Sequence, residues 1–225
     1  VRERAERIQR ALDQLPEVEA KKKPGEKEKA RASTTDPEAR VMKMADGGFR
    51  PAYNVQLATD TESQVITGMD VTNSGSDQGK MASMVQQHEE RYEQTPDEML
   101  VDGGFVKKDD ITKVSAPEGD TSVYAPVMPS KKDDQDPHAP RFDDSPAVAE
   151  WRTRMGTDAA KEIYKERAAT AECVNAIARN RGLQQFRVRG SPKARAVVLW
   201  YVLAHNLMRA IALRAEQDKD NEGNG

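Results

Sequence analysis

Cysteine is almost absent from this chain, since its 225 residues contain only Cys173. A single thiol excludes an internal disulfide framework and any metal cluster held by several thiolates. Histidine is nearly as scarce, and His88, His138 and His205 are too dispersed to form a metal-binding motif. Chemistry that depends on clustered thiolates or imidazoles is therefore not expected.

Long apolar runs are missing too. The longest apolar stretch, residues 196–213, is interrupted by three polar residues, so it predicts a buried helix rather than a membrane span. There is also no signal peptide, and we therefore expect a cytoplasmic protein without a membrane partner. Within this helix we expect His205 and Asn206 to be hydrogen-bonded core groups, and Trp200 and Tyr201 to lie in the core.

Hydrophobic residues make up only 36% of the chain and charged residues 32%. The length suits one large domain with appendages, but much of the chain must be solvated helix or linker. Two glycine pairs, at 47–48 and 103–104, lack the spacing of a phosphate-binding loop, so no nucleotide site is predicted.

Positive charge is unevenly distributed. Residues 151–214 contain 13 Lys or Arg against 4 Asp or Glu, whereas the whole chain has a net charge of -3. A basic segment of this kind suits a polyanionic partner, although basic patches also arise without one.

The first 32 residues predict a charged helix and a linker. Ala5, Ile8 and Leu12 repeat at spacings of three and four, as on a narrow apolar helix face, and Pro16 is expected to end or kink that helix. Residues 21–29 contain no apolar side chain and are typical of a mobile charged linker. Residues 33–40 then predict a turn capped by Asp36.

The middle of the chain has the pattern of a mixed α/β domain. Residues 52–60 and 64–72 predict an antiparallel hairpin, and residues 80–92 a helix that crosses back over it. Residues 98–102 predict a short strand that ends at Asp102, followed by glycines. Open α/β sheets gather their ligand sites at such strand ends.

The remaining segments complete the order of elements. We predict a short helix at 109–114, a strand at 122–127, a loop insertion at about 129–146, helix from 151 to 182 broken near Gly156, a basic connector at 185–193, a final helix from about 194 to 215, and a disordered tail at 215–225. The order is that of most of a ribonuclease-H-like fold, a mixed sheet with flanking helices, lacking its first strand.

Glu172 is a lone acid on a basic helical face. At a period of 3.6 residues, one face carries Lys161, Lys165, Ala168, Glu172, Asn175 and Arg179. A surface helix whose acid pairs with solvated neighbours would give the same pattern. Asp102 has a similar alternative, as an ordinary turn aspartate beside two glycines.

Several stretches resemble one family in its own order. They are STTDPEARVMKMADGGFRPAYNVQLATD, VTNSGSDQG, LVDGGF and YKERAATAECVNAIARNRGLQQFRVRG. Together they cover about residues 33–214 and resemble the C-terminal half of a group of bacterial insertion-sequence transposases with a DDE catalytic domain. Relatives have a Tyr, Arg, Glu, Lys pattern around the last acid, which Tyr164, Arg167 and Glu172 resemble. Four residues separate Arg167 from Glu172, where some relatives have three, and Arg179 stands where they have Lys.

The resemblance implies three catalytic acids that hold metal ions. Asp102 and Glu172 correspond to the second and third, whereas the Asp-Gly-Thr-Lys stretch that carries the first has no counterpart here. Asp60 is a poorer candidate for that first position. We therefore expect this chain to be the C-terminal portion of a longer transposase, inactive on its own.

The implied chemistry is cleavage and transfer of DNA strands. Two Mg²⁺ or Mn²⁺ ions would clamp the attacking and leaving oxygens, and carboxylates suit these hard cations. The expected partners are double-stranded DNA, at transposon ends and target, and a second subunit in a synaptic homodimer. The basic residues predicted to bind DNA are Lys161, Lys165, Arg167, Arg179, Arg187, Arg189 and Lys193.

Two other functions fit the same sequence. The chain could be an inactive remnant that binds DNA or dimerises with an intact transposase, or a soluble α/β protein that merely has a basic helix. Weak, salt-insensitive DNA binding would favour the latter, because phosphate contacts give a steep dependence on salt.

Overall fold

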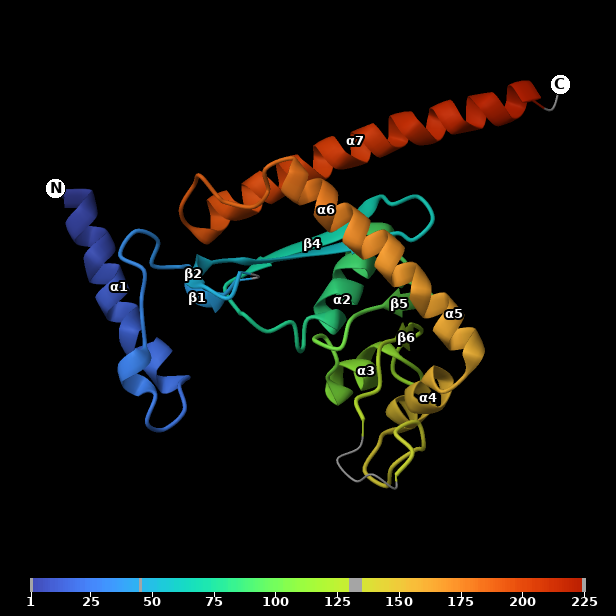
Figure 1. The fold of residues 1–225 in the computed structure, drawn as a ribbon, viewed down its shortest axis with the longest axis horizontal. Coiled ribbons are helices and arrows are strands. Elements are labelled where there is room, and N and C mark those ends of the chain that lie inside the picture. The colour runs from blue at the N-terminus through green and yellow to red at the C-terminus, as the bar shows by residue number, and fades with distance from the viewer. Residues whose placement is uncertain (1, 45, 130–134, 224–225) are drawn as a thin grey trace. The chain divides into compact units, whose positions relative to one another are not determined.

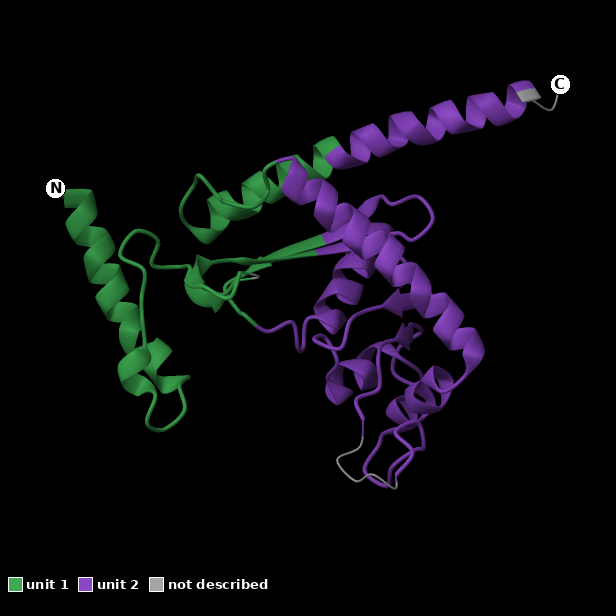
Figure 2. Ribbon diagram, in the orientation of Figure 1, with its two compact units in different colours: residues 1–56, 69–75, 182–204 green, residues 57–68, 76–181, 205–225 purple. Residues whose placement is uncertain are grey.

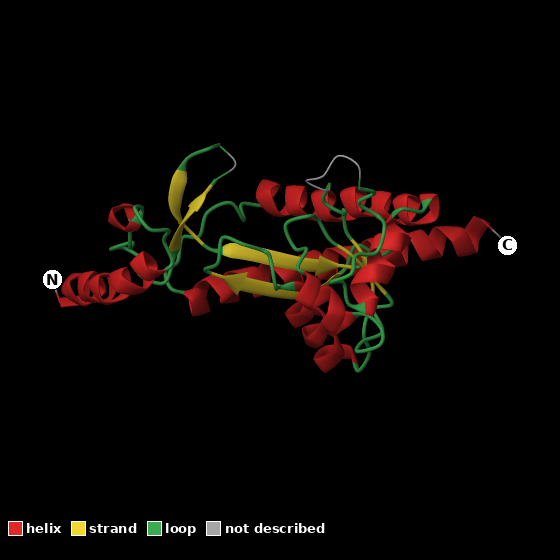
Figure 3. Cartoon of the chain, turned by 90° about the horizontal axis from the view of Figure 1, so that it is seen from below, coloured by secondary structure: helices red, strands yellow, loops and turns green. Residues whose placement is uncertain are grey.

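The computed structural model describes residues 2–44, 46–129 and 135–223, and part of the predicted 129–146 insertion lies outside them. Within these ranges the chain is a mixed α/β protein in which helices predominate (Figures 1 and 3). Its strands form three two-stranded sheets, β1–β2, β3–β4 and β5–β6. A single ribonuclease-H-like sheet remains a prediction.

The chain divides into two compact units, which Figure 2 colours separately. Unit 1 comprises residues 1–56, 69–75 and 182–204, and unit 2 comprises residues 57–68, 76–181 and 205–225. The division falls within β3 (Asn54–Thr59), β4 (Ile66–Thr72) and α7 (Ser191–Gly223).

Unit 1 begins with α1 (Arg2–Ala20), which continues through Pro16 rather than ending there. After the 3₁₀ turn Lys27–Lys29, the chain forms a hairpin of β1 (Arg40–Lys43) and β2 (Phe49–Ala52). This hairpin was not predicted, because both strands are short and one contains Pro51, which is unfavourable in a strand interior.

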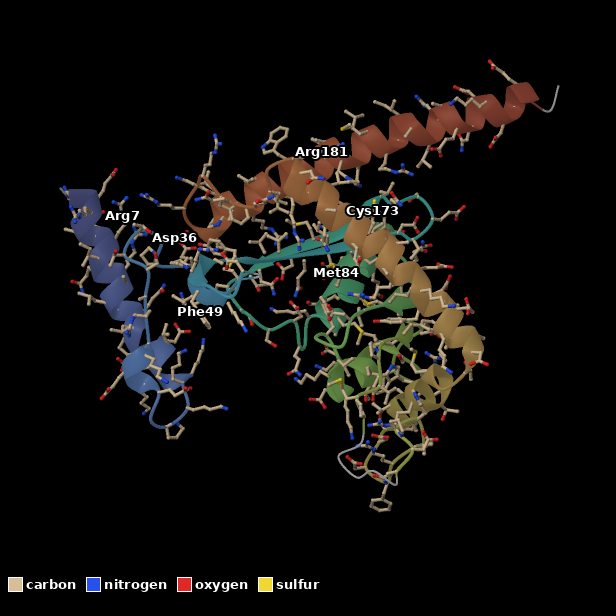
Figure 4. All side chains as sticks on the ribbon, in the orientation of Figure 1. Arg7, Asp36, Phe49, Met84, Cys173 and Arg181 are labelled. Atoms are coloured by element: carbon tan, nitrogen blue, oxygen red, sulfur yellow. The ribbon has the colours of Figure 1, made fainter. Side chains whose placement is uncertain are left out.

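Asp36 was predicted to cap a local turn, but it also bonds a residue that is distant in the sequence. The carboxylate of Asp36, which is labelled in Figure 4, accepts hydrogen bonds from Tyr53 Oη at 3.1 Å and from Gly190 N at 3.0 Å. Glu38 accepts one from Ser191 N at 2.9 Å. These acids therefore hold the N-terminus of α7, where free backbone N–H groups favour negative charge.

The core of unit 2 lies between a parallel strand pair and helices. β5 (Glu98–Leu100) pairs with β6 (Ser122–Tyr124) in parallel, confirming the short strand predicted before Asp102. The surrounding helices are α2 (Met81–Tyr92), α3 (Lys108–Val114), α4 (Pro146–Met155) and α5 (Asp158–Arg167). The buried side chains of these helices and strands, including Met81, Ile111, Val123, Val148 and Trp151, form one cluster.

The part of α7 in unit 2 holds the turn between β3 and β4. His205, 2% exposed, bonds the carbonyl of Gln64, and the Asn206 amide bonds both N and O of Ile66. The predicted core roles of His205 and Asn206 are confirmed. Trp200 is 72% exposed, so its predicted place in the core is wrong.

α7 continues to Gly223, although we predicted that it would end near residue 215 and leave a disordered tail. Residues 215–222 contain neither Pro nor Gly, so nothing in them stops a helix. Residues 191–222 are long and apolar enough to cross a membrane by length and composition, which is weak evidence for a span.

Candidate active-site region around Asp102

Asp102 lies in a tight turn directly after β5. Its Oδ1 accepts a hydrogen bond from Gly104 N at 2.8 Å, and its carbonyl accepts one from Phe105 N at 3.2 Å. A Cβ at Gly104 would lie only 2.9 Å from Oδ1, which explains the glycine at this position. The turn orients the carboxylate, and Asp102 remains about half exposed, with 45% of its side chain open to solvent.

Two residues of α5 contact the end of β5. Tyr164 Oη donates to the carbonyl of Val101 at 3.1 Å, and Arg167 Nη2 lies 3.4 Å from Asp102 Oδ2. Burial raises the pKa of Tyr164, so its phenol remains a donor at neutral pH. The Tyr and Arg singled out in the sequence are thus the residues that fix this helix to the Asp102 strand.

Glu172 ends a π-helical segment, Ala168–Glu172, between α5 and α6 (Cys173–Asn180). In an α-helix, five residues rotate by about 500°, so Glu172 would point about 140° away from Arg167. A π-turn, whose hydrogen bonds run from residue i to i+5, contains about one residue more than an α-turn, so it turns Glu172 back towards the side of the helix that carries Arg167. The π segment accommodates the additional residue between Arg167 and Glu172. The predicted basic face assumed a regular α-helical period, so it does not continue unchanged beyond Arg167.

A second carboxylate lies beside Asp102, and sequence reasoning did not single it out. The Cβ position at Gly104 is 3.7 Å from Asp77 Oδ2 as well as 2.9 Å from Asp102 Oδ1. Asp77 lies in the VTNSGSDQG stretch used for the family resemblance, and that stretch was the available signal. Its 25-residue separation from Asp102 gives no local pattern that would predict the proximity.

Asp60 stabilises a turn through local hydrogen bonds. Its Oδ1 accepts hydrogen bonds from Ser63 N at 2.7 Å and Ser63 Oγ at 2.5 Å, within the turn that joins β3 to β4. Such side-chain bonds to nearby backbone are typical of turn aspartates.

Among residues 2–44, 46–129 and 135–223, no three His, Cys, Asp or Glu side chains are placed to hold a metal ion. Asp102 uses one oxygen for Gly104 and the other for Arg167. The described donors therefore do not form a complete site for two divalent ions.

The basic residues of unit 2 differ in their surroundings. Lys161 forms an ion pair with Asp158 at 2.9 Å, and Lys165 forms one with Glu162 at 2.6 Å. Arg167 instead pairs with Asp102. Both lysine pairs are exposed on the helix surface, where ion pairs are weak and a phosphate can replace the carboxylate. Arg179 is exposed on α6.

The other predicted DNA contacts, Arg187, Arg189 and Lys193, belong to unit 1. All three are exposed, and they lie in the connector and the first turn of α7. Gly190 and Ser191 between them are held by Asp36 and Glu38.

Residues 135–211 match the family model of a transposase DDE domain. The matched segment contains Tyr164, Arg167 and Glu172, and ends within α7. It covers less than half of the chain and supports a DDE transposase. No curated protein and no solved structure matches the chain.

Proposed function

We propose that this chain is the C-terminal part of the catalytic domain of a DDE transposase of the insertion-sequence type. Its role would be to bind DNA at transposon ends and target, and to contribute Asp102 and Glu172 to strand cleavage and transfer. The complete domain would have the ribonuclease-H-like sheet expected from the order of elements. Because its partner is DNA, we place the protein in the cytoplasm.

The observation that carries this proposal is the contact between α5 and the end of β5. Tyr164 and Arg167 lie in the segment that matches the transposase DDE domain, and both contact the strand end that carries Asp102. Two parts of the chain that separately resemble the family therefore meet at the strand end that carries Asp102. Glu172 itself is exposed, and the support for its role is its place in the segment that matches the DDE domain.

DDE transposase domains generally use divalent metals, and Mg²⁺ or Mn²⁺ would stabilise charge on the phosphate during displacement. The described carboxylates do not make a full set of ligands, so we assign no metal step to this chain alone. What its own residues do is position Asp102, through Gly104 and Arg167, and present basic side chains to DNA.

Salt-dependent DNA binding tests the proposed function. A labelled duplex titrated with the intact chain should bind measurably at about 50 mM salt, and each phosphate contact should add about 0.9 to the slope of log K against log salt. The Lys161→Ala/Lys165→Ala double variant should lower this slope by about 2. Fluorescence anisotropy measures both quantities.

Lys113→Ala provides the matched control, because Lys113 is exposed in unit 2 but lies on α3, outside the basic segment. Its slope should equal that of the wild type. Binding that does not change with salt, or equal losses in both variants, would overturn the assignment to DNA.

A further inference from the structure

The ion pair between Arg167 and Asp102, both in unit 2, is weak by its geometry. Arg167 Nη2 lies 3.4 Å from Asp102 Oδ2, whereas charge-assisted bonds of this kind are usually about 2.7–2.9 Å long. The two side chains are 24% and 45% exposed, so water screens the attraction between their charges. Another anion can therefore replace the carboxylate at little cost.

Each member of the pair also has an anchor that does not involve the other. Asp102 Oδ1 accepts a hydrogen bond from Gly104 N at 2.8 Å, which holds the carboxylate in place. α5 is fixed to the same strand end by Tyr164, whose Oη donates to the carbonyl of Val101 at 3.1 Å. The Arg167 side chain can therefore rotate to a different partner while the helix and the turn stay where they are.

Arg167 lies on the side of α5 that faces the strand end. At about 100° per residue, Tyr164 is about 60° from Arg167 around the helix, whereas Lys161 and Lys165 are about 120° and 160° away. The two lysine side chains are 54% and 70% exposed. A phosphate that reaches Arg167 therefore lies at the end of β5, and is not one held by Lys165.

We propose that Arg167 exchanges partners when DNA binds. In the free chain it pairs with Asp102, and in the complex its guanidinium moves to the phosphate nearest the end of β5, which leaves Oδ2 of Asp102 without its counter-charge. The phosphate is the better partner, because a guanidinium can donate to two of its oxygens at once, whereas Arg167 reaches Asp102 through Nη2. The exchange rests on the proposed function, because it requires DNA at this turn.

The exchange links DNA binding to the state of the Asp102 carboxylate. Because the ion pair must break before Arg167 contacts a phosphate, the pair weakens DNA binding by the amount that it stabilises the free chain. Conversely, Asp102 is released only when a phosphate occupies the end of β5. DNA held only by Lys161 and Lys165, on the other side of α5, leaves the pair intact.

A double-mutant cycle on DNA affinity tests the exchange. A labelled duplex is titrated with the intact chain at about 50 mM salt in the presence of EDTA, and fluorescence anisotropy gives the affinity. Asp102→Asn should tighten binding about three- to tenfold, because it releases Arg167 and removes a negative charge. In an Arg167→Gln background only the charge effect remains, so the same substitution should tighten binding less than about twofold. Arg167→Gln alone should lower the salt slope by about 0.9.

Lys165 provides the matched control, because it is an exposed cation of the same helix that pairs with Glu162. Asp102→Asn should tighten binding equally in the wild type and in a Lys165→Ala background. Helix content by circular dichroism should be unchanged in all variants, since Tyr164 still anchors α5. If Arg167→Gln unfolds, Arg167→Met, which keeps an aliphatic stem without the charge, replaces it in the same cycle.

Equal tightening by Asp102→Asn with and without Arg167 overturns the exchange but leaves the proposed function standing, since DNA still binds. Weaker binding by Asp102→Asn overturns it as well, because the carboxylate would then help to hold DNA. Tightening that also disappears in the Lys165→Ala background would show a general effect of charge on α5 and would count against the exchange. A chain without salt-dependent DNA binding overturns both the exchange and the proposed function.

Discussion

A buried ion cluster offers the sharpest prediction for a single residue. The Asp144 side chain is 0% exposed, and it lies 2.7 Å from Arg152, which is 6% exposed, and 2.8 Å from Lys108. Asp144→Asn should lower the free energy of unfolding by about 3–5 kcal/mol, because it leaves the buried guanidinium without its counter-charge. Urea denaturation measures the loss.

Asp143→Asn is the control for that variant. Asp143 pairs with the same Lys108 at 2.7 Å, but its side chain is 72% exposed. Its loss should cost less than about 1 kcal/mol. Similar losses in the two variants would show that burial of the Arg152 pair is not what stabilises α4.

The same cluster predicts a dependence on pH. Burial favours the neutral form of Asp144, but Lys108, the backbone N–H of Arg141 and Arg152 outweigh it and hold its pKa below the ordinary 3.8. A lowered pKa contributes stability above the unfolded value, and this contribution is lost as pH falls below about 4. Urea unfolding between about pH 6 and pH 3 should show a steeper loss in the wild type than in Asp144→Asn. Equal slopes would contradict the assignment.

Residues could be predicted from the sequence where chemistry is local. The turn at Asp102 was predictable from the glycines that follow it, and the buried, hydrogen-bonded His205 from its position in an apolar helix. The positions of Asp77 and of the Asp144 cluster were not predictable. Asp77 is 25 residues from Asp102 in the sequence, and Asp144 is 36 residues from Lys108, so only folding brings them together. Trp200 was misassigned because an apolar helix face looks the same whether the chain or a partner covers it.

The π segment is the most informative single element. If Ala168–Glu172 accommodates an additional residue, deletion of Ala169 should restore a regular α-helix and keep Arg167 and Glu172 on one face. We expect an unfolding temperature within about 2 °C of the wild type, or higher. Differential scanning calorimetry measures it.

Deletion of Ala176 is the matched control, since this exposed alanine lies in α6, where the helix is regular. It rotates the following residues by about 100° and turns Ala178, 4% exposed, out of the core. A loss of about 2 kcal/mol should lower the unfolding temperature by about 4–8 °C. If the Ala169 deletion costs as much, the π segment is not an insertion that the helix can lose.

Elements were predictable where periodicity was strong. The helices at 80–92 and 109–114, and the break near Gly156, agree with α2, α3 and the start of α5 within one or two residues. The β1–β2 hairpin was missed, and the register change at Ala168 was invisible, because an α-helical period and one π-turn differ by a single residue. The residues Ala168–Glu172 contain nothing that favours a π-turn over an α-turn, so the sequence alone did not predict it.

For the whole molecule, we predict binding of DNA without cleavage. Strand cleavage needs several carboxylates that hold two ions about 3.5–4 Å apart. In the described chain Asp102 is engaged by Gly104 and Arg167, and no group of three suitable side chains is placed to bind metal. A supercoiled plasmid incubated with the intact chain and Mg²⁺ or Mn²⁺ should therefore remain supercoiled on an agarose gel.

Asp102→Ala decides how a positive result would be interpreted. Nicking that requires metal and disappears in this variant would contradict the prediction, and would show that a further acid completes the site. Asp77→Asn and Asp60→Asn would then identify it: Asp77 lies beside the Asp102 turn, whereas Asp60 is engaged by Ser63. Nicking that survives Asp102→Ala and persists after further purification would show that the activity does not need the carboxylate at the end of β5.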